Sequence, residues 1–63
     1  MPKLNSGSLV EIYSDPINRI GSKGIARLIM FLGIGRTVGN QHLEKWEVVF
    51  NGTTHKEVKE ILC

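Results

Sequence analysis

The sequence predicts a single all-β domain, and three observations support this fold class. Short stretches of alternating apolar and charged residues recur along the chain, most clearly in residues 45–50, KWEVVF. Glycine, asparagine and proline residues separate these stretches, as they do where strands reverse direction. The central apolar run lacks the polar face that a surface helix carries. With 63 residues, the chain is long enough for one domain with a thin core.

The first third of the chain predicts an approach segment, a strand and a long loop. Residues 1–7 are rich in Pro, Asn, Ser and Gly, and residues 8–13, SLVEIY, have the composition of a strand. We expect a loop over residues 14–24, because Asp15 and Pro16 favour a turn and proline does not fit a central strand. Gly21 and Gly24 allow positive φ angles in this loop.

The apolar run over residues 25–32 has two interpretations. Ala, Leu, Met and Arg are good helix formers, so a helix competes with a strand here. Glycines close both ends of the run, and we therefore favour a mostly buried strand. In this strand Ala26 and Leu28 share one face with Met30 and Leu32, since side chains alternate between faces.

The second half of the chain predicts a flexible hairpin tip over residues 33–43, a strand over residues 45–50 and a short final element. The Asn51-Gly52 pair favours a type I′ turn after this strand. The tail over residues 54–63 fits either a short helix, from its capping-box spacing, or a last strand. The predicted core consists of Val10, Ile12, Ala26, Leu28, Trp46, Val48 and Phe50.

The order of these pieces resembles that of small Src-homology-3-like β-barrels, especially those with a KOW motif. The resemblance rests on three runs: Gly7-x-x-Val10-x-Ile12, Gly24-x-Ala26-x-x-Ile29 and Trp46-x-Val48-x-Phe50. It implies a five-stranded barrel with room for a short C-terminal helix or helical turn. The layout is also similar to that of short barrels encoded by bacteriophages. The chain departs from the KOW pattern in the stretched loop SDPIN, and a resemblance of fold does not by itself imply an activity.

Composition sets limits on cofactors and compartment. The formal charge of +2 permits a polyanionic partner without requiring one. Cys63 is the single cysteine, and His42 and His55 lack neighbours at metal-ligand spacing, so we expect no metal and no cofactor. The chain has no disulfide pair, signal peptide or membrane-length apolar run, which predicts a soluble cytoplasmic protein that does not associate with membranes.

The candidate binding residues are one aromatic and four cationic side chains. Arg19, Lys23 and Arg27 surround the glycines of residues 18–29, and Arg36 lies in the predicted hairpin tip. Cations and backbone N–H groups on such loops can hold a phosphate, although the Walker order is missing and ordinary loop cations fit as well. Tyr13 has an apolar ring that could stack on a base or contact a partner.

These residues support a non-catalytic module that binds a protein partner and self-associates, through strand addition at an open sheet edge or through an aromatic-edged groove. The alternative is a nucleic-acid-binding module that places its basic loops on phosphates. We expect no small-molecule substrate and no enzyme activity, because no catalytic constellation occurs in one copy. An enzyme would need a site shared among several copies at a symmetric pore.

Overall fold

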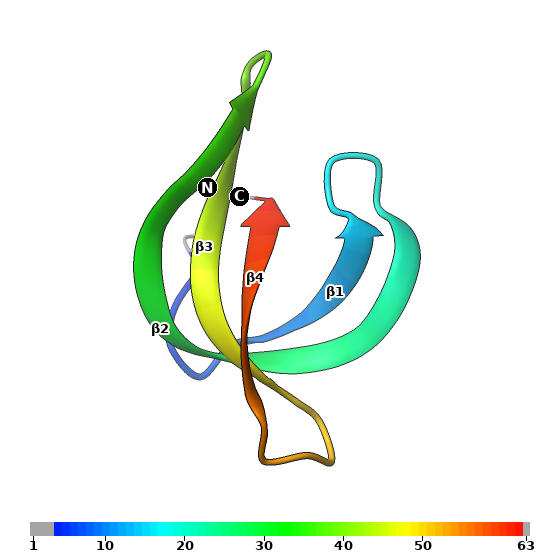
Figure 1. Cartoon of the computed structure of the whole chain (residues 1–63), viewed down its shortest axis with the longest axis vertical. Coiled ribbons are helices and arrows are strands. Elements are labelled where there is room, and N and C mark those ends of the chain that lie inside the picture. Colours follow the sequence, from blue (N-terminus) through cyan, green and yellow to red (C-terminus); the bar gives the residue numbers. More distant parts are fainter. Residues whose placement is uncertain (1–3, 63) are drawn as a thin grey trace.

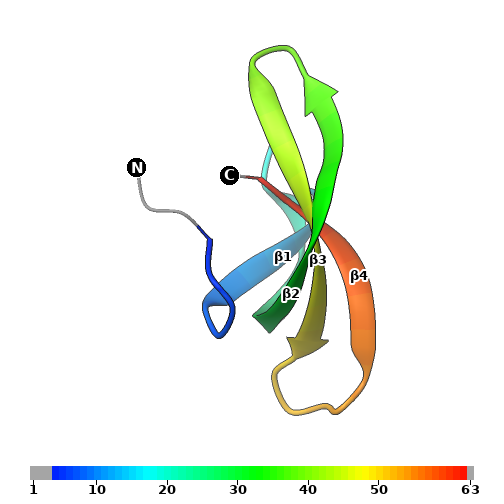
Figure 2. The same ribbon diagram turned by 90° about the vertical axis from the view of Figure 1, so that its left-hand side faces the viewer.

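The computed structural model describes residues 4–62 and shows one curled antiparallel sheet (Figures 1 and 2). Its strands are β1 (Leu9–Asp15), β2 (Ile20–Val38), β3 (Gln41–Phe50) and β4 (Lys56–Leu62). They follow one another in the sheet in chain order, each paired antiparallel with its sequence neighbour. The described residues contain no helix, which confirms the all-β prediction.

The long strand β2 bends the sheet into a half-barrel. It pairs with β1 through its first part and with β3 through the rest. Its pairing with β3 shifts register between Leu28 and Met30, between Phe31 and Gly33, and between Ile34 and Thr37. Such irregularities bend a strand and increase its local twist, so one strand can serve both sides of the curled sheet.

The core lies on the concave face of this sheet. Residues that pair directly across strands share a face, and two such pairs point inwards: Ala26 with Phe50, and Leu28 with Val48. The buried cluster consists of Ile12, Ala26, Leu28, Trp46, Val48 and Ile61. Five of the seven predicted core residues are therefore buried, while Val10 and Phe50 are half-buried and pack against the cluster. Ile61 and Leu43 are buried although the sequence did not single them out.

The described part of the chain has fewer strands than expected, and its tail adopts one of the two structures that the sequence left open. Four strands are present where five were expected, and residues 56–62 form β4 instead of the helix or helical turn allowed for the C-terminal segment. The capping-box spacing of Thr54 and Glu57 is overridden because β4 gains a full ladder with β3 and buries Ile61 against the core. The strand interpretation of residues 25–32 is confirmed, since they lie within β2, but this strand is not mostly buried. Ala26 and Leu28 are buried, whereas Met30 and Leu32 are 50% and 43% exposed, because the register shifts after Leu28.

The loops are shorter than expected. The predicted loop over residues 14–24 shrinks to a four-residue turn, residues 16–19, because Gly21 and Gly24 belong to β2 and pair with or lie opposite β1. The Asp15 side chain holds this turn by accepting hydrogen bonds from the backbone N–H and the side-chain amide of Asn18. Within the predicted tip over residues 33–43, β2 continues to Val38 and β3 starts at Gln41, so only residues 39–40 form the turn.

The chain reverses at the Asn51-Gly52 pair, but through a different turn from the one predicted. The Thr53 N–H donates to the Phe50 carbonyl at 3.0 Å, and Gly52 has a φ of 84°. Asn51 does not share the positive φ that a type I′ turn needs at both central residues. One positive φ at the third position is the pattern of a type II turn.

Candidate functional site

The half-barrel is open between β1 and β4, the two edge strands of the sheet. The described residues pair β1 with β2 and β4 with β3, and they place no strand between the two outer edges. The curl of the sheet turns these edges towards each other, so β4 faces β1 across an opening in Figure 1. We call the opening between Leu9–Asp15 and Lys56–Leu62 the seam. Two solvent-open pockets of about 250 Å³ and 330 Å³ lie in it, and Tyr13, Pro16 and Glu60 line both.

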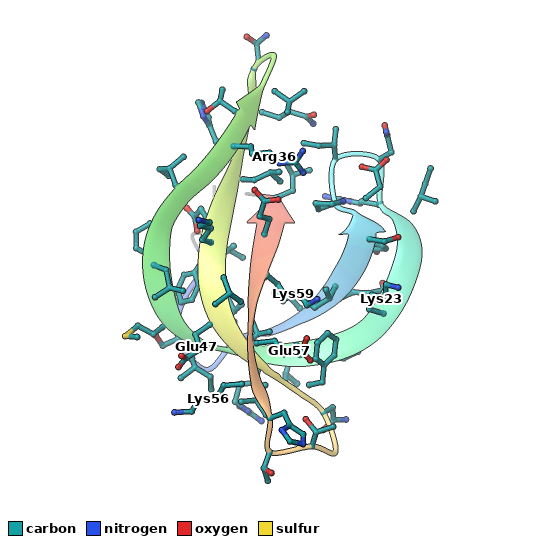
Figure 3. The ribbon with its side chains drawn as sticks, viewed as in Figure 1. Lys23, Arg36, Glu47, Lys56, Glu57 and Lys59 are labelled. Atoms are coloured by element: carbon teal, nitrogen blue, oxygen red, sulfur yellow. The ribbon has the colours of Figure 1, made fainter. Side chains whose placement is uncertain are left out.

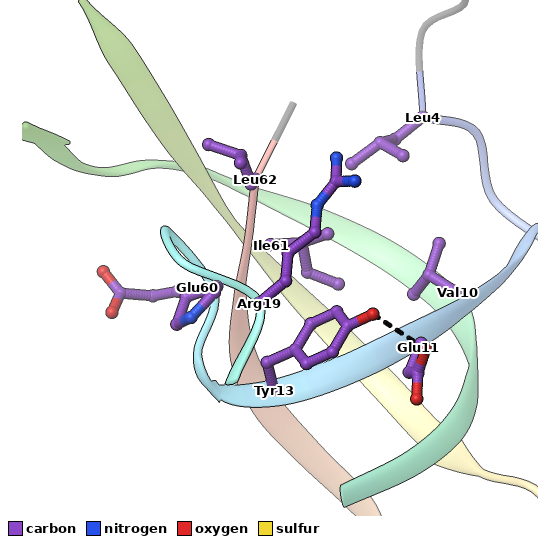
Figure 4. A pocket seen from close by; sticks show the side chains of 9 residues that line it. Leu4, Val10, Glu11, Tyr13, Arg19, Glu60, Ile61 and Leu62 are labelled. Carbon is purple, nitrogen blue, oxygen red and sulfur yellow. Dashed lines mark hydrogen bonds between the residues drawn. The ribbon is translucent and has the colours of Figure 1, made fainter. Parts of the chain in front are cut away.

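The smaller pocket combines an apolar wall with charged rims (Figure 4). Val10, Ile61 and Leu62 supply apolar surface from the two edge strands, and Leu4 adds to it from the N-terminal segment. Arg19 reaches along the pocket from the turn between β1 and β2, where its φ is 56°. A positive φ is uncommon for a residue other than glycine. The turn therefore fixes the direction in which this cationic side chain leaves the backbone.

A hydrogen-bond network holds Tyr13 at the seam. The Tyr13 hydroxyl donates to the Glu11 carboxylate at 2.8 Å, and the Ser22 hydroxyl donates to the other oxygen of the same carboxylate. The bond from Ser22, followed by the bond from Tyr13, holds the pKa of Glu11 below its usual value. The bond to Glu11 raises the pKa of Tyr13, because the phenol must keep its proton to donate. These two side chains are therefore neutral tyrosine and charged glutamate at neutral pH.

The larger pocket is mainly cationic. Lys23, Arg36 and Lys59 line it together with Glu60, and Figure 3 shows how these cations lie around the opening. The Arg36 Nε lies 3.1 Å from each carboxylate oxygen of Glu60, so this arginine is already paired. Across both pockets the lining contains four cations and two carboxylates, since Arg19 and Glu11 come from the smaller one. The seam is therefore apolar along its walls and net positive at its rims.

Four of the five sequence-predicted binding residues meet at the seam. Tyr13, Arg19, Lys23 and Arg36 come from β1, the first turn and both halves of β2. Arg27 is separate: it lines a pocket beside the β3–β4 turn, and its guanidinium donates to the Gly7 carbonyl at 3.0 Å. Because Lys23 and Arg27 lie in the continuous strand β2, residues 18–29 do not form one loop that could gather these cations.

Sequence reasoning missed the contribution of β4 to this site. Val58, Lys59, Glu60, Ile61 and Leu62 all line the seam. The β-branched residues Val58 and Ile61 fit a strand, and the four charged residues of KEVKEIL fit an exposed edge, but the segment has no strict alternation that would have identified it. The helical spacing of Val58, Ile61 and Leu62 left the choice between a helix and a strand open.

A second apolar surface lies where β2 and β3 extend beyond the core. Phe31 and Trp46 pack edge to face with ring centroids 5.5 Å apart, and the Trp46 indole N–H donates to Glu44 at 2.9 Å. Leu4 completes a pocket of about 300 Å³ with these three residues. Trp46 is buried and belongs to the core, whereas Phe31 is 48% exposed. This surface offers an apolar contact but no charged groups at its edge other than Glu44.

Residues 4–62 contain neither a cluster of metal ligands nor a membrane-length helix. In that range no three His, Cys, Asp or Glu side chains gather as they would around a metal ion, and Cys63 lies outside the described residues. The same range contains no helix that is long and apolar enough to cross a membrane. No protein-family model, no curated protein and no solved structure matches this chain.

Proposed function

We propose that this chain is a non-catalytic cytoplasmic module that binds an extended segment of a protein partner in the seam. The observation that carries the proposal is the open pair of edges, with solvent-open pockets lying between β1 and β4. Backbone N–H and C=O groups on an edge strand are a template for adding another strand. A bound segment would gain main-chain hydrogen bonds from an edge and bury apolar side chains against Val10, Ile61 and Leu62.

The added strand would also relate the fold to the small Src-homology-3-like barrels that the sequence resembles. Four strands come from this chain, and we propose that the partner supplies a fifth. In Figure 1 the arrows of β1 and β4 both point upwards on the two sides of the opening, so an inserted strand could run antiparallel to both edges. The net positive rims favour a partner segment that alternates acidic and apolar residues.

The experiment is a pull-down from nuclease-treated native lysate with a matched pair of variants. Arg19→Gln removes a cation from the seam, and Arg27→Gln removes one outside it. We expect Arg19→Gln to reduce retention of a partner protein while Arg27→Gln leaves it unchanged. With the purified partner segment, amide NMR shifts should change along Leu9–Asp15 and Lys56–Leu62. Changes confined to the β2–β3 hairpin would reject the proposal.

Nucleic-acid binding is the second candidate, and the gathering of Arg19, Lys23, Arg36 and Lys59 around one opening favours it. The pairing of Arg36 with Glu60 and the presence of Glu11 lower the charge available to phosphates. A salt titration separates the two candidates, because phosphate contacts release counterions and weaken steeply as salt rises. Recovery of only RNA or DNA without nuclease treatment would favour this candidate.

A further inference from the structure

The charges on β4 form a self-complementary pattern around an exposed valine. Lys56, Glu57, Val58, Lys59 and Glu60 follow one another along the edge strand. Residues at equal distances from Val58 carry opposite charges on both sides. Val58 itself is 56% exposed, although it is a large apolar residue on a free edge (Figure 3 labels its charged neighbours). The pattern therefore has an unburied apolar centre.

Antiparallel pairing of β4 with a second copy of itself would use this pattern in one register. A two-fold axis perpendicular to the joined sheet leaves the same face of both copies on the same side. One residue then lies directly opposite its own counterpart in the second copy, and this central residue defines the register. Centred on Val58, it places the two valines opposite each other. Lys56 then faces Glu60 of the second copy, and Glu57 faces Lys59 of the second copy. By symmetry this gives opposite charges in all four charged pairs.

Neighbouring registers lack this complementarity. A centre on Glu57 places two glutamates directly opposite each other, and a centre on Lys59 does the same with two lysines. Like charges directly opposite destabilise a strand pair, so these alternatives are disfavoured. Charged side chains usually protect an edge strand from pairing with another copy. Here the order of positive and negative residues around Val58 removes this protection in the register centred on Val58. It keeps the protection in the two neighbouring registers, centred on Glu57 and Lys59.

We propose that this protein forms a two-fold dimer by antiparallel pairing of β4 with β4 of a second copy, centred on Val58. The proposal deepens the proposed function, on which it rests for the use of the open edge. In this dimer Lys56 turns from Glu47, Glu57 and Lys59 turn from each other, and Glu60 leaves Arg36. The side chains of Lys56 and Glu57 are 64% and 49% exposed, and those of Lys59 and Glu60 are 34% and 29% exposed, so all four reach solvent at the edge. Because the same edge of β4 borders the seam, dimerisation and partner binding exclude each other. The partner then competes with a second copy of the chain.

Charge reversal provides the test. The double variant Glu57→Lys with Glu60→Lys makes the edge wholly positive, and Lys56→Glu with Lys59→Glu makes it wholly negative. We expect the wild-type chain to dimerise between micromolar and millimolar concentrations in sedimentation velocity, and each double variant to dimerise at least tenfold more weakly. An equimolar mixture of the two variants restores every opposite-charge pair, so it should form a heterodimer with wild-type affinity. Reversal of all four charges together should restore the homodimer.

Two controls make the outcome specific. Arg27→Glu with Asn40→Asp and Gln41→Glu changes the net charge by the same amount as the negative variant at exposed positions outside β4 and the seam, so it should dimerise normally. In a Cys63→Ser background, Val58→Cys should form an intermolecular disulfide, because the Cα atoms of directly opposite residues lie about 4.5–5.5 Å apart. Lys56→Cys, which faces Glu60 of the second copy, should not.

The results also separate this proposal from the proposed function. A wild-type chain that stays monomeric at millimolar concentration, or double variants that dimerise as well as wild type, would overturn the dimer. If that chain still binds its partner in the seam, the proposed function survives. A dimer that follows the charge rules but captures no partner protein would support the dimer and reject the proposed function.

Discussion

Replacement of Leu28 by alanine should cost far more stability than the same replacement at Leu9. Leu28 is fully buried on the concave face, opposite Val48, whereas Leu9 is 59% exposed on the edge strand β1. Truncating a buried leucine costs about 2–5 kcal/mol, from lost burial and from the cavity that remains. The same change at Leu9 should cost about 1 kcal/mol or less, because most of that side chain is already in water. Chains of this length have a total stability of about 3–9 kcal/mol, so Leu28→Ala removes a large part of it.

Urea unfolding followed by Trp46 fluorescence measures both variants. Trp46 is only 4% exposed and belongs to the same buried cluster, so its emission should change when the core opens. In thermal unfolding, each 1 kcal/mol should lower Tm by about 4–8 °C for a domain of this size. Free energies of unfolding that fall by the same amount in the two variants would refute the assignment of Leu28 to the concave face.

Three further predictions concern the backbone and the polar surface. Gly24 has a φ of 110° with open space around its α-carbon, so Gly24→Ala should cost about 1–3 kcal/mol of backbone strain alone, and unchanged urea unfolding would contradict this. Ser22→Ala should raise the pKa of Glu11, because the serine hydroxyl donates to its carboxylate. The lowered pKa of Glu11 in the folded wild type stabilises the fold at pH values above the pKa of Glu11 in the unfolded chain. This stabilisation is lost as the pH falls through the pKa of the folded state. An NMR titration should find that Glu11 takes up its proton at a lower pH in the wild type than in Ser22→Ala. Arg36→Gln breaks an ion pair with Glu60 that is largely exposed to solvent, so unfolding should change by about 1 kcal/mol or less, and a loss of several kcal/mol would show that the pair is structural.

Local sequence patterns predicted those parts of the fold in which a strand has a clear inward and outward face. Trp46 and Val48 alternate with charged or half-buried neighbours, and β3 forms where this alternation predicts it. β1 is likewise close to the predicted strand over residues 8–13. In both strands one face carries a run of apolar residues, Val10 and Ile12 in β1 and Trp46 and Val48 in β3, while a glutamate marks the other face.

The remaining elements depend on tertiary pairing, which local patterns do not contain. Glycines at positions 21, 24, 33 and 35 suggested loops, but they lie within β2, where three of them have positive φ and help the strand bend. The final strand was ambiguous because Val58, Ile61 and Leu62 also fit a helical spacing. The ladder with β3 stabilises this segment as a strand, and the pairs from Val49 with Lys56 to Leu43 with Leu62 form only across the turn, beyond the window of a local pattern.

In the candidate site, too, the sequence predicted the residue types but not their arrangement in space. Cationic residues could be named from the sequence, but their gathering at the seam depends on the curl of β2, which brings Lys23 and Arg36 to one pocket from opposite ends of the strand. Arg27 was placed with them by proximity in sequence, yet strand alternation and pairing carry it to Gly7 instead. The contribution of β4 followed only from knowing which strands lie at the edges.

The meander order of the sheet has a consequence for synthesis of the chain on the ribosome. Every strand pairs with the strand made just before or after it, so β1 and β2 can form a hairpin before the later strands emerge. Of the four described strands, β4 leaves the exit tunnel after the others. The outer edge of β4, with Val58 at its centre, therefore emerges after the edges of the other three strands. Neighbouring nascent chains on one messenger RNA would present this edge to one another at high local concentration.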